Sequence, residues 1–178
     1  AKDTPNFIGN RIGVFSMLST MHHTQAFELG FDVADALTGP AIGRPKSATY
    51  RTADVVGLDT MGHVIGTMTA TLEDDPWHRY FKVPEWLQQL VEKGALGQKA
   101  GAGIYRKQGR KITVLDLTQG DYRESNSELD PEVQALLKER NPAKKLAGLR
   151  NHQHPQAQFL WSIFRDLFHY CCLLYTSD

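Results

Sequence analysis

Apolar residues dominate the first thirty positions of the chain and do not keep to one narrow stripe. They wrap most of the way round a helix that we predict over residues 5–29. A helix that is apolar nearly all round is typical of the buried centre of a domain. Thr4 followed by Pro5 favours a helix start, because the hydroxyl caps free amides and the ring fixes φ where no N–H is needed. The apolar positions are Phe7, Ile8, Ile12, Val14, Phe15, Met17, Leu18 and Met21.

Shorter periodic segments separated by Gly and Pro predict four further helices, over residues 33–37, 47–56, 59–72 and 84–93. We expect Asp32 to cap the first of them and Gly57 to break the second from the third. The loop aromatics Trp77, Tyr80 and Phe81 are expected to pack onto the helices. The last helix is amphipathic, and we assign its apolar face to the core or to a subunit contact; that face carries Trp86, Leu87, Leu90 and Val91.

The pattern changes from helix to strand after the glycine-rich residues 97–103. Residues 104–107 and 111–115 predict a β hairpin, and residues 116–121 a second turn. Asp130 before Pro131 predicts a helix to about residue 140, with Asp at the N-cap and Pro at the first helical position. Asn141-Pro142 breaks that helix, and helical character continues through Leu167. Residues 170–178 show no cap and no amphipathic pattern, so we interpret them as a truncation or a cloning scar.

Composition bounds the class of protein. The chain has 178 residues, of which 41% are hydrophobic and 22% charged, as in an ordinary globular chain. Its 20 basic and 20 acidic residues cancel, so no basic patch favours nucleic acid and no polybasic tail favours a membrane. Neither a signal peptide nor an apolar run long enough to span a membrane is apparent. The adjacent Cys171 and Cys172 predict no disulfide, which favours a reducing, cytoplasmic location.

Three segments, in order, resemble the signatures of 3-hydroxyacyl-CoA dehydrogenases. They are Asp3-Thr4-Pro5-x-Phe7-Ile8-x-Asn10-Arg11-Ile12, Asp54-Val55-Val56-Gly57-Leu58-Asp59-Thr60 and Gly97-Gln98-Lys99-Ala100-Gly101-Ala102-Gly103-Ile104-Tyr105. The resemblance implies an all-α C-terminal domain like that of 6-phosphogluconate dehydrogenase, followed by a small β hairpin and further helices. We expect this domain over residues 1–107, a hairpin and linker over 108–124, and a further helical segment over 125–170. Residues 171–178 are left as a doubtful tail. The segment around Arg44 is most similar to the large enzymes fused to an enoyl-CoA hydratase.

The resemblance also implies a reaction, in which a 3-hydroxyacyl-CoA is oxidised to a 3-ketoacyl-CoA in fatty acid β-oxidation with NAD as the acceptor. The family's catalytic His and Glu lie in a nucleotide-binding domain that these residues do not include, so we expect a fragment that is inactive alone. The resemblance assigns Asn10 to catalysis and substrate binding. Its amide can donate hydrogen bonds to the substrate oxygen without carrying a charge. Gly9 and Gly13 beside it are expected to let a ligand or another backbone approach closely.

Three cations are further candidates. The resemblance places Lys99, in its glycine-rich loop, toward the cofactor, where an ammonium suits ribose or phosphate oxygens. Lys46 and Arg51 could meet a phosphate of coenzyme A, although their place near a helix end favours solvated positions. Arg11 is expected to pair with a structural carboxylate. Asp54 and Asp59 are expected to cap and lock the broken helix.

Other chemistry finds little support in the sequence. His22 and His23 are adjacent, so on a helix they point about 100° apart and do not share an ion easily. His152 and His154 have no acidic or thiolate partner at ligand spacing, so we predict no metal site. Cys171 has no neighbour that would activate it as a nucleophile.

Two alternatives to the acyl-CoA enzyme stay open: the helical domain of another NAD-dependent hydroxyacid dehydrogenase, and a purely structural dimerisation module. Expected partners are an acyl-CoA and either a second copy of the chain or a second helical copy within one polypeptide.

Overall fold

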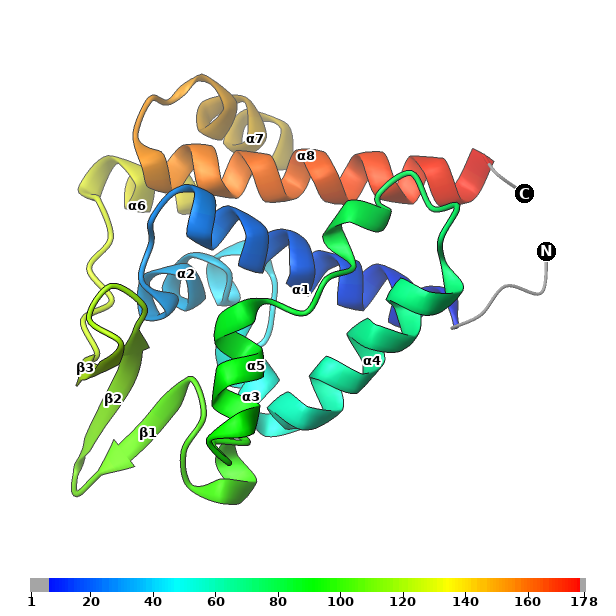
Figure 1. Ribbon diagram of the computed structural model, residues 1–178. Helices are drawn as coiled ribbons and strands as arrows, with labels where there is room; N and C mark the ends of the chain where they lie inside the picture. Colours follow the sequence, from blue (N-terminus) through cyan, green and yellow to red (C-terminus); the bar gives the residue numbers. More distant parts are fainter. Residues whose placement is uncertain (1–6, 177–178) are drawn as a thin grey trace.

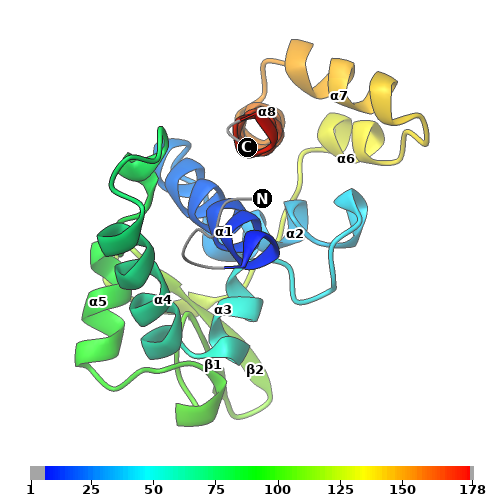
Figure 2. The ribbon, with the colours of Figure 1, turned by 90° about the vertical axis from the view of Figure 1, so that its right-hand side faces the viewer.

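The computed structural model of the chain describes residues 7–176. Its two longest helices, α1 (Ile8–Ala26) and α8 (Pro155–Thr176), pack along each other through the middle of the molecule (Figure 1). Seen along α8, the short helices α6 (Pro131–Leu137) and α7 (Pro142–Asn151) lie beside that helix, and α1 lies between it and the helices of residues 50–92 (Figure 2). The first and last helices therefore form the centre of the fold.

Short helices and 3-10 turns follow α1 at nearly the predicted places. Gly57 separates two of the helices with a φ of 99°, a left-handed conformation that favours glycine, so the predicted break is confirmed. The elements are α2 (Phe31–Leu37), η1 (Pro40–Ile42), α3 (Tyr50–Val56), α4 (Leu58–Thr71), η2 (His78–Tyr80), α5 (Glu85–Glu92) and η3 (Gln98–Ala100).

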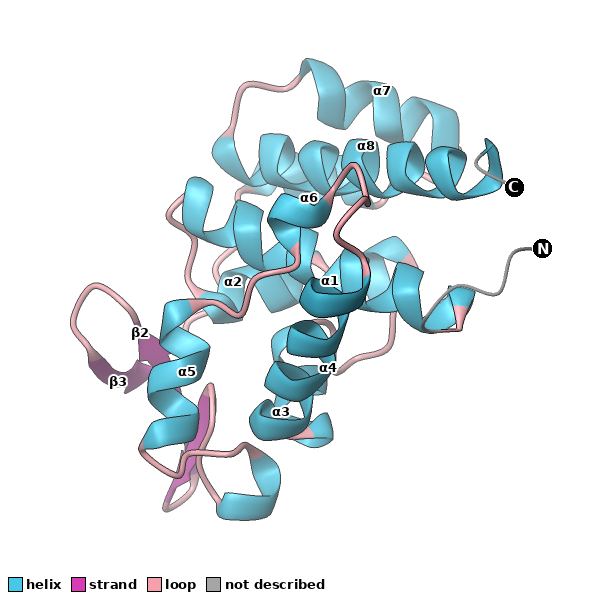
Figure 3. Ribbon diagram, turned by 45° about the vertical axis from the view of Figure 1, so that its right-hand side comes forward, coloured by secondary structure: helices cyan, strands magenta, loops and turns pink. Residues whose placement is uncertain are grey.

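A small antiparallel sheet stands at one edge of the helices (Figure 3). Its strands, in spatial order, are β1 (Tyr105–Gln108), β2 (Lys111–Asp116) and β3 (Asp121–Glu124). The predicted hairpin is confirmed as β1 and β2. β3 was not predicted, because a strand of four mostly polar residues is too short to show an alternating pattern. Helices with one small sheet confirm the predicted fold class.

Phe15 of α1 is the centre of an aromatic cluster. Its ring stacks on Tyr170 of α8, with centroids 3.9 Å apart, and meets Trp77 edge-on at 5.3 Å. Tyr80 and Phe81 surround the same ring at 5.8 and 6.4 Å. The predicted packing of the loop aromatics is therefore confirmed. Trp86, Leu87 and Leu90 of α5 are also buried, which assigns that face to the core of this chain.

The start of α1 differs from the prediction. Thr4 and Pro5 lie outside the described residues, and α1 begins after Phe7 with no side-chain cap. The helix is buried nearly all round only over residues 15–24. Its first turn leaves Phe7 77% and Ile8 53% exposed, because no other part of residues 7–176 covers it.

One further expectation, the capping role of Asp32, is corrected. Asp32 lies inside the first turn of α2, whose N-cap is Gly30, so it is not the cap. Its buried carboxylate instead accepts hydrogen bonds from Arg123 and from the amide of Asn126. Helix α8 runs to residue 176, so it includes most of the segment interpreted as a truncation or a cloning scar, and it buries Tyr170 and Leu174.

Helix starts in the last third follow their sequence signals. The Asp130 carboxylate accepts the amides of Glu132 and Val133, with Pro131 at the first position of α6. Asn141 caps α7 in the same way, through the amide of Lys144. The sequence reading took Asn141-Pro142 for a break only, whereas it also begins the next helix.

Candidate functional site

Asn10 lies in the first turn of α1, one residue before the first amide that is hydrogen-bonded within the helix. Its side chain is exposed and makes no hydrogen bond to any other described residue. It is therefore neither a capping residue nor an amide satisfied in the core. A Cβ built on Gly13, one turn further along, would meet nothing within 4 Å. The expected close approach of another backbone is therefore not found there among residues 7–176.

Arg11, next to Asn10, fixes this turn to the rest of the fold. Its Nη2 donates to Asp75 Oδ2 at 2.5 Å and its Nε to Tyr170 Oη at 2.7 Å. Burial lowers the pKa of Arg11, but the hydrogen bonds to Asp75 and Tyr170 outweigh it and raise the pKa overall. The predicted pairing of Arg11 with a structural carboxylate is confirmed, and the carboxylate is that of Asp75, in the loop after α4.

The second and third signature segments are docked onto each other through Asp54. Its buried carboxylate accepts the amides of Ile104 and Tyr105, both at 2.8 Å. A Cβ on Gly97 or Gly103 would collide with Asp54, so these two glycines are required by the close approach. Asp54 is structural, as expected, but it fixes the glycine-rich loop to α3 and does not cap a helix.

Lys99 lies on this loop and pairs with Asp59, in the first turn of α4. Its Nζ lies 2.7 Å from both carboxylate oxygens, and its side chain is 51% exposed. The pair stands at the start of α4, whereas Arg11 contacts Asp75 beyond the end of that helix. The 14 residues of α4 put about 20 Å between the two places. The fold therefore does not bring Lys99 and Asn10 together.

The other two predicted cations lie near α3. Lys46 is exposed, in the turn before that helix. Arg51 is half-buried, with its guanidinium 4.2 Å from the ring centroid of Tyr105, a cation–π contact. The Tyr105 hydroxyl in turn donates to Asp35, whose carboxylate also accepts three amides at the start of α3. Burial raises the pKa of Asp35 to about 6.

The sequence reading missed Arg44, the cation that lies against α1. Its Nη2 donates to Ser16 Oγ at 2.6 Å and its Nη1 to Thr49 Oγ1 at 3.4 Å. No carboxylate of residues 7–176 pairs with it, and burial lowers its pKa. Ser16 follows Asn10 by about 9 Å along the helix axis. The signal for such a residue, a cation whose partners are hydroxyls, is absent from the sequence.

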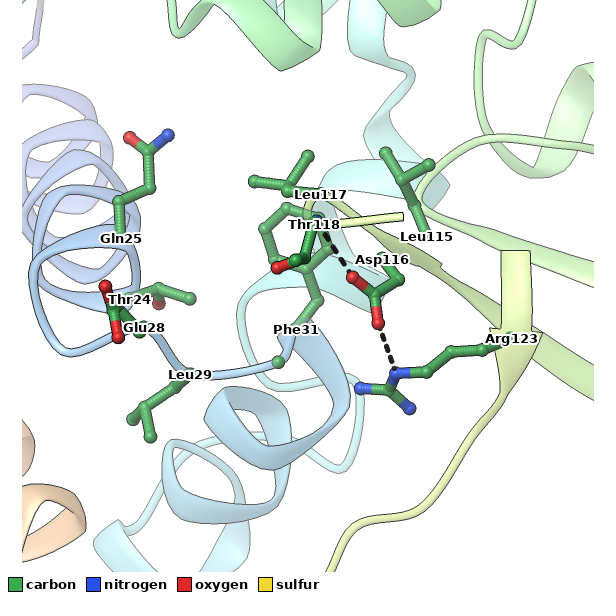
Figure 4. A pocket seen from close by; sticks show the side chains of 11 residues that line it. Thr24, Gln25, Glu28, Leu29, Phe31, Leu115, Asp116, Leu117, Thr118 and Arg123 are labelled. Carbon is green, nitrogen blue, oxygen red and sulfur yellow. Dashed lines mark hydrogen bonds and ion pairs between the residues drawn. The ribbon is translucent and has the colours of Figure 1, made fainter. Parts of the chain in front are cut away.

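A pocket of about 620 Å³ lies between the end of α1, the start of α2 and the β2–β3 turn (Figure 4). Arg123 lines the pocket and donates from Nε to Asp116 Oδ2 at 3.2 Å. Its lining includes none of the residues predicted for the site, so the pocket is separate from Asn10 and Lys99.

Three histidines lie against carboxylates of other elements. His23 Nε2 lies 2.6 Å from Asp166 Oδ2 of α8, and His22 stacks on Tyr80 with centroids 4.6 Å apart. His152 lies 2.9 Å from Glu132 and His154 3.7 Å from Asp130, so acidic partners do exist, supplied by the distant α6. Among residues 7–176, no three His, Cys, Asp or Glu side chains are arranged to hold a metal ion. Burial raises the pKa of the Cys171 thiol, which disfavours the thiolate.

Comparison with known proteins gives one family. The sequence model described as "3-hydroxyacyl-CoA dehydrogenase, C-terminal domain" matches residues 7–107. A Bacillus subtilis protein named "Probable 3-hydroxyacyl-CoA dehydrogenase" is 39% identical over 180 residues, covering 100% of this chain and 22% of its own. A Deinococcus radiodurans protein of the same name is 44% identical over 110 residues, which are 60% of this chain and 30% of its own.

A third relative, from Rickettsia prowazekii, is 29% identical over 125 residues, covering 67% of this chain and 17% of its own. Its name describes a trifunctional enzyme of a fatty acid oxidation complex. The chain thus spans less than a third of the length of each of these relatives. No solved structure matches it, and no helix in the part of the chain that the structure describes is long and apolar enough to cross a membrane.

Proposed function

Because the chain belongs to the family of 3-hydroxyacyl-CoA dehydrogenase C-terminal domains, we propose that it supplies the substrate-binding domain of an NAD-dependent enzyme of that kind. The enzyme would oxidise a 3-hydroxyacyl-CoA to a 3-ketoacyl-CoA in fatty acid β-oxidation. The nucleotide-binding domain, with the catalytic His and Glu of the family, would come from outside residues 1–178. Without them, these residues alone would have no turnover.

One observation carries the proposal: an exposed carboxamide with no hydrogen-bond partner among residues 7–176, on a helix turn that a buried ion pair holds in place. In the reaction the C3 hydroxyl would lose its proton to a base outside residues 1–178, and NAD, when bound, would supply the acceptor of the hydride. The Asn10 amide would donate a hydrogen bond to the C3 oxygen and keep it oriented while its charge changes. A preorganised donor of this kind typically contributes a factor of about 10²–10³ to the rate.

The cations near α3 support binding of the rest of the substrate. Lys46 and Arg51 would contact phosphate oxygens of coenzyme A, Lys46 from an exposed turn and Arg51 from its seat on Tyr105. Arginine suits such oxygens because its guanidinium presents several donors in one plane. The acyl-CoA would then extend between the two ends of the domain.

Lys99 fits a cofactor contact from this domain. Its ammonium has three donors, of which two meet Asp59. The third can reach a ribose or phosphate oxygen, and the half-exposed side chain leaves room for it. Asp59 would keep the ammonium in place.

The domain would also provide packing surface, either to a second copy of the chain or to a second helical copy within a longer polypeptide. Val55 and Val56, at the end of α3, are 64% and 48% exposed and are available for such a contact. Because Trp86 and Leu90 are buried within the chain, the face of α5 would not take part.

The test is turnover by the full-length protein. We expect NADH to be oxidised in the presence of acetoacetyl-CoA and not in the presence of free acetoacetate. Turnover of free hydroxy or keto acids without that of CoA thioesters would favour another hydroxyacid dehydrogenase. No turnover of either, by a protein that binds NADH, would leave a structural module.

A further inference from the structure

We propose that Tyr170, in the last turns of α8, is a positioning residue for Asn10, and that α8 acts as a brace for the catalytic turn of α1. The inference rests on the proposed function of Asn10. It concerns residues well beyond the part of the chain that the family model matches, which ends at residue 107.

The turn that carries Asn10 needs an external support. The first amides of a helix have no partner within it, so a first turn frays unless side chains hold it. Here the turn is not capped, and its apolar residues Phe7 and Ile8 are exposed. Of residues 8–11, Arg11 alone makes side-chain hydrogen bonds to other described residues, so it carries the fixation of the turn.

The Tyr170 hydroxyl completes a closed set of three hydrogen bonds. It accepts from Arg11 Nε at 2.7 Å and donates to Asp75 Oδ2 at 3.0 Å, while Arg11 Nη2 donates to the same oxygen at 2.5 Å. The Asp75 side chain and Tyr170 are each 1% exposed, and the Arg11 side chain is 13% exposed. Two donors on one guanidinium and two different partners fix its orientation as well as its distance.

Tyr170 is itself held rigidly. Its ring stacks on Phe15, which lies one turn after Arg11 on the same face of α1. The ring is 1% exposed, and it also meets Phe81 at a centroid distance of 6.3 Å. The aromatic core therefore fixes the position of the Tyr170 hydroxyl, and through it that of Arg11, the residue beside Asn10.

A donor that stabilises a developing charge must lie about 2.7–3.1 Å from it. A misplacement of about 1 Å can cost as much as 10²-fold in rate. Tyr170→Phe removes the hydroxyl but keeps the stacked ring and the ion pair between Arg11 and Asp75, so the fold is retained while the turn is held less firmly. We expect kcat to fall roughly 10-fold, a part of the full effect of the donor, with the KM for the acyl-CoA changed less than threefold.

The decisive readout is the double variant in the full-length protein. Asn10→Ala alone should lower kcat by about 10²–10³-fold. If Tyr170 acts only through Asn10, Tyr170→Phe has no further effect in the Asn10→Ala background. The matched control is Tyr80→Phe, which removes a similar Tyr–Asp bond, from Tyr80 Oη to Asp166 Oδ2 at 3.0 Å, but beside His23 near the other end of α1. It should leave kcat unchanged.

Three results would overturn the inference: an unchanged kcat in Tyr170→Phe, a tenfold fall that persists in the Asn10→Ala background, or an equal fall in Tyr80→Phe. Amide hydrogen exchange separates this failure from that of the proposed function. If Asn10→Ala leaves turnover intact, the catalytic role of Asn10 is refuted. Faster exchange over residues 11–14 in Tyr170→Phe, but not in Tyr80→Phe, would then show that Tyr170 supports the first turn of α1 although Asn10 is not catalytic.

Discussion

The contact between the second and third signature segments gives a sharp prediction of stability. Asp54→Ala removes the acceptor of two amides, those of Ile104 and Tyr105, which the carboxylate holds at 2.8 Å. The carboxylate is 6% exposed and the Ile104 side chain is fully buried, so water has little access to the amides left behind. The segment from the glycine-rich loop into β1 should then separate from α3.

The magnitude follows from the two orphaned donors. Each buried amide left without a partner costs about 1–3 kcal/mol, which gives about 2–6 kcal/mol for the pair. Burial raises the pKa of Asp54, and its removal relieves that cost of burying a charge, so we expect the lower part of the range, about 3 kcal/mol. For a chain of this size that lowers Tm by about 6–12 °C.

Urea unfolding of the 178-residue chain, followed by tryptophan fluorescence, measures the effect, with the m-value showing whether the transition stays two-state. Asp59→Ala is the matched control, since it removes another aspartate of the same signature, whose partner Lys99 is exposed. It should leave the unfolding midpoint unchanged within error. If Asp59→Ala costs as much as Asp54→Ala, the assignment of Asp54 as the link between the segments is wrong.

Two other perturbations test the ion pair of α8 and the cofactor contact. Burial raises the pKa of Asp166, but hydrogen bonds from His23, Arg165 and Tyr80 outweigh it and lower the pKa overall. The stabilisation that the Asp166 carboxylate contributes should be complete above the pKa of the unfolded state, about 3.8. It should be lost as pH falls through the lower pKa of the folded state. The stability advantage of the wild type over Asp166→Asn, from urea midpoints at several pH values, should thus shrink below about pH 4, and an advantage that grows on acidification would contradict the sign. Lys99→Ala in the full-length protein should raise the KM for NAD about 3–10-fold with kcat little changed, as for a contact made equally in the ground and transition states. An unchanged KM for NAD would limit Lys99 to its pairing with Asp59.

Local signals in the sequence predicted local structure well. Asp130-Pro131 and Gly57 mark a helix start and a helix break by the chemistry of one or two residues, and both are found where expected. Arg11 was expected to meet a structural carboxylate, and it does. Which carboxylate it meets depends on the fold, since Asp75 is 64 positions away.

The role of Asp32 was predicted wrongly because a distant residue sets it. Asp32 resembles an N-cap in sequence, but its partner Arg123 is 91 positions later. The buried positions of α8 continue at helical spacing through Phe159, Ile163, Asp166, Tyr170 and Leu174. A polar residue stands within this stripe, because Asp166 is bound by His23 and Tyr80.

The proposed function depends on Asn10, whose amide would donate to the substrate oxygen. The most direct measurement is kcat of the full-length Asn10→Ala variant with acetoacetyl-CoA and NADH. Gln25→Ala is the control, because it removes another exposed carboxamide from the same helix, far from the first turn. We expect a loss of about 10²–10³-fold for Asn10→Ala and none for Gln25→Ala. A kcat for Asn10→Ala within twofold of the wild type would contradict it.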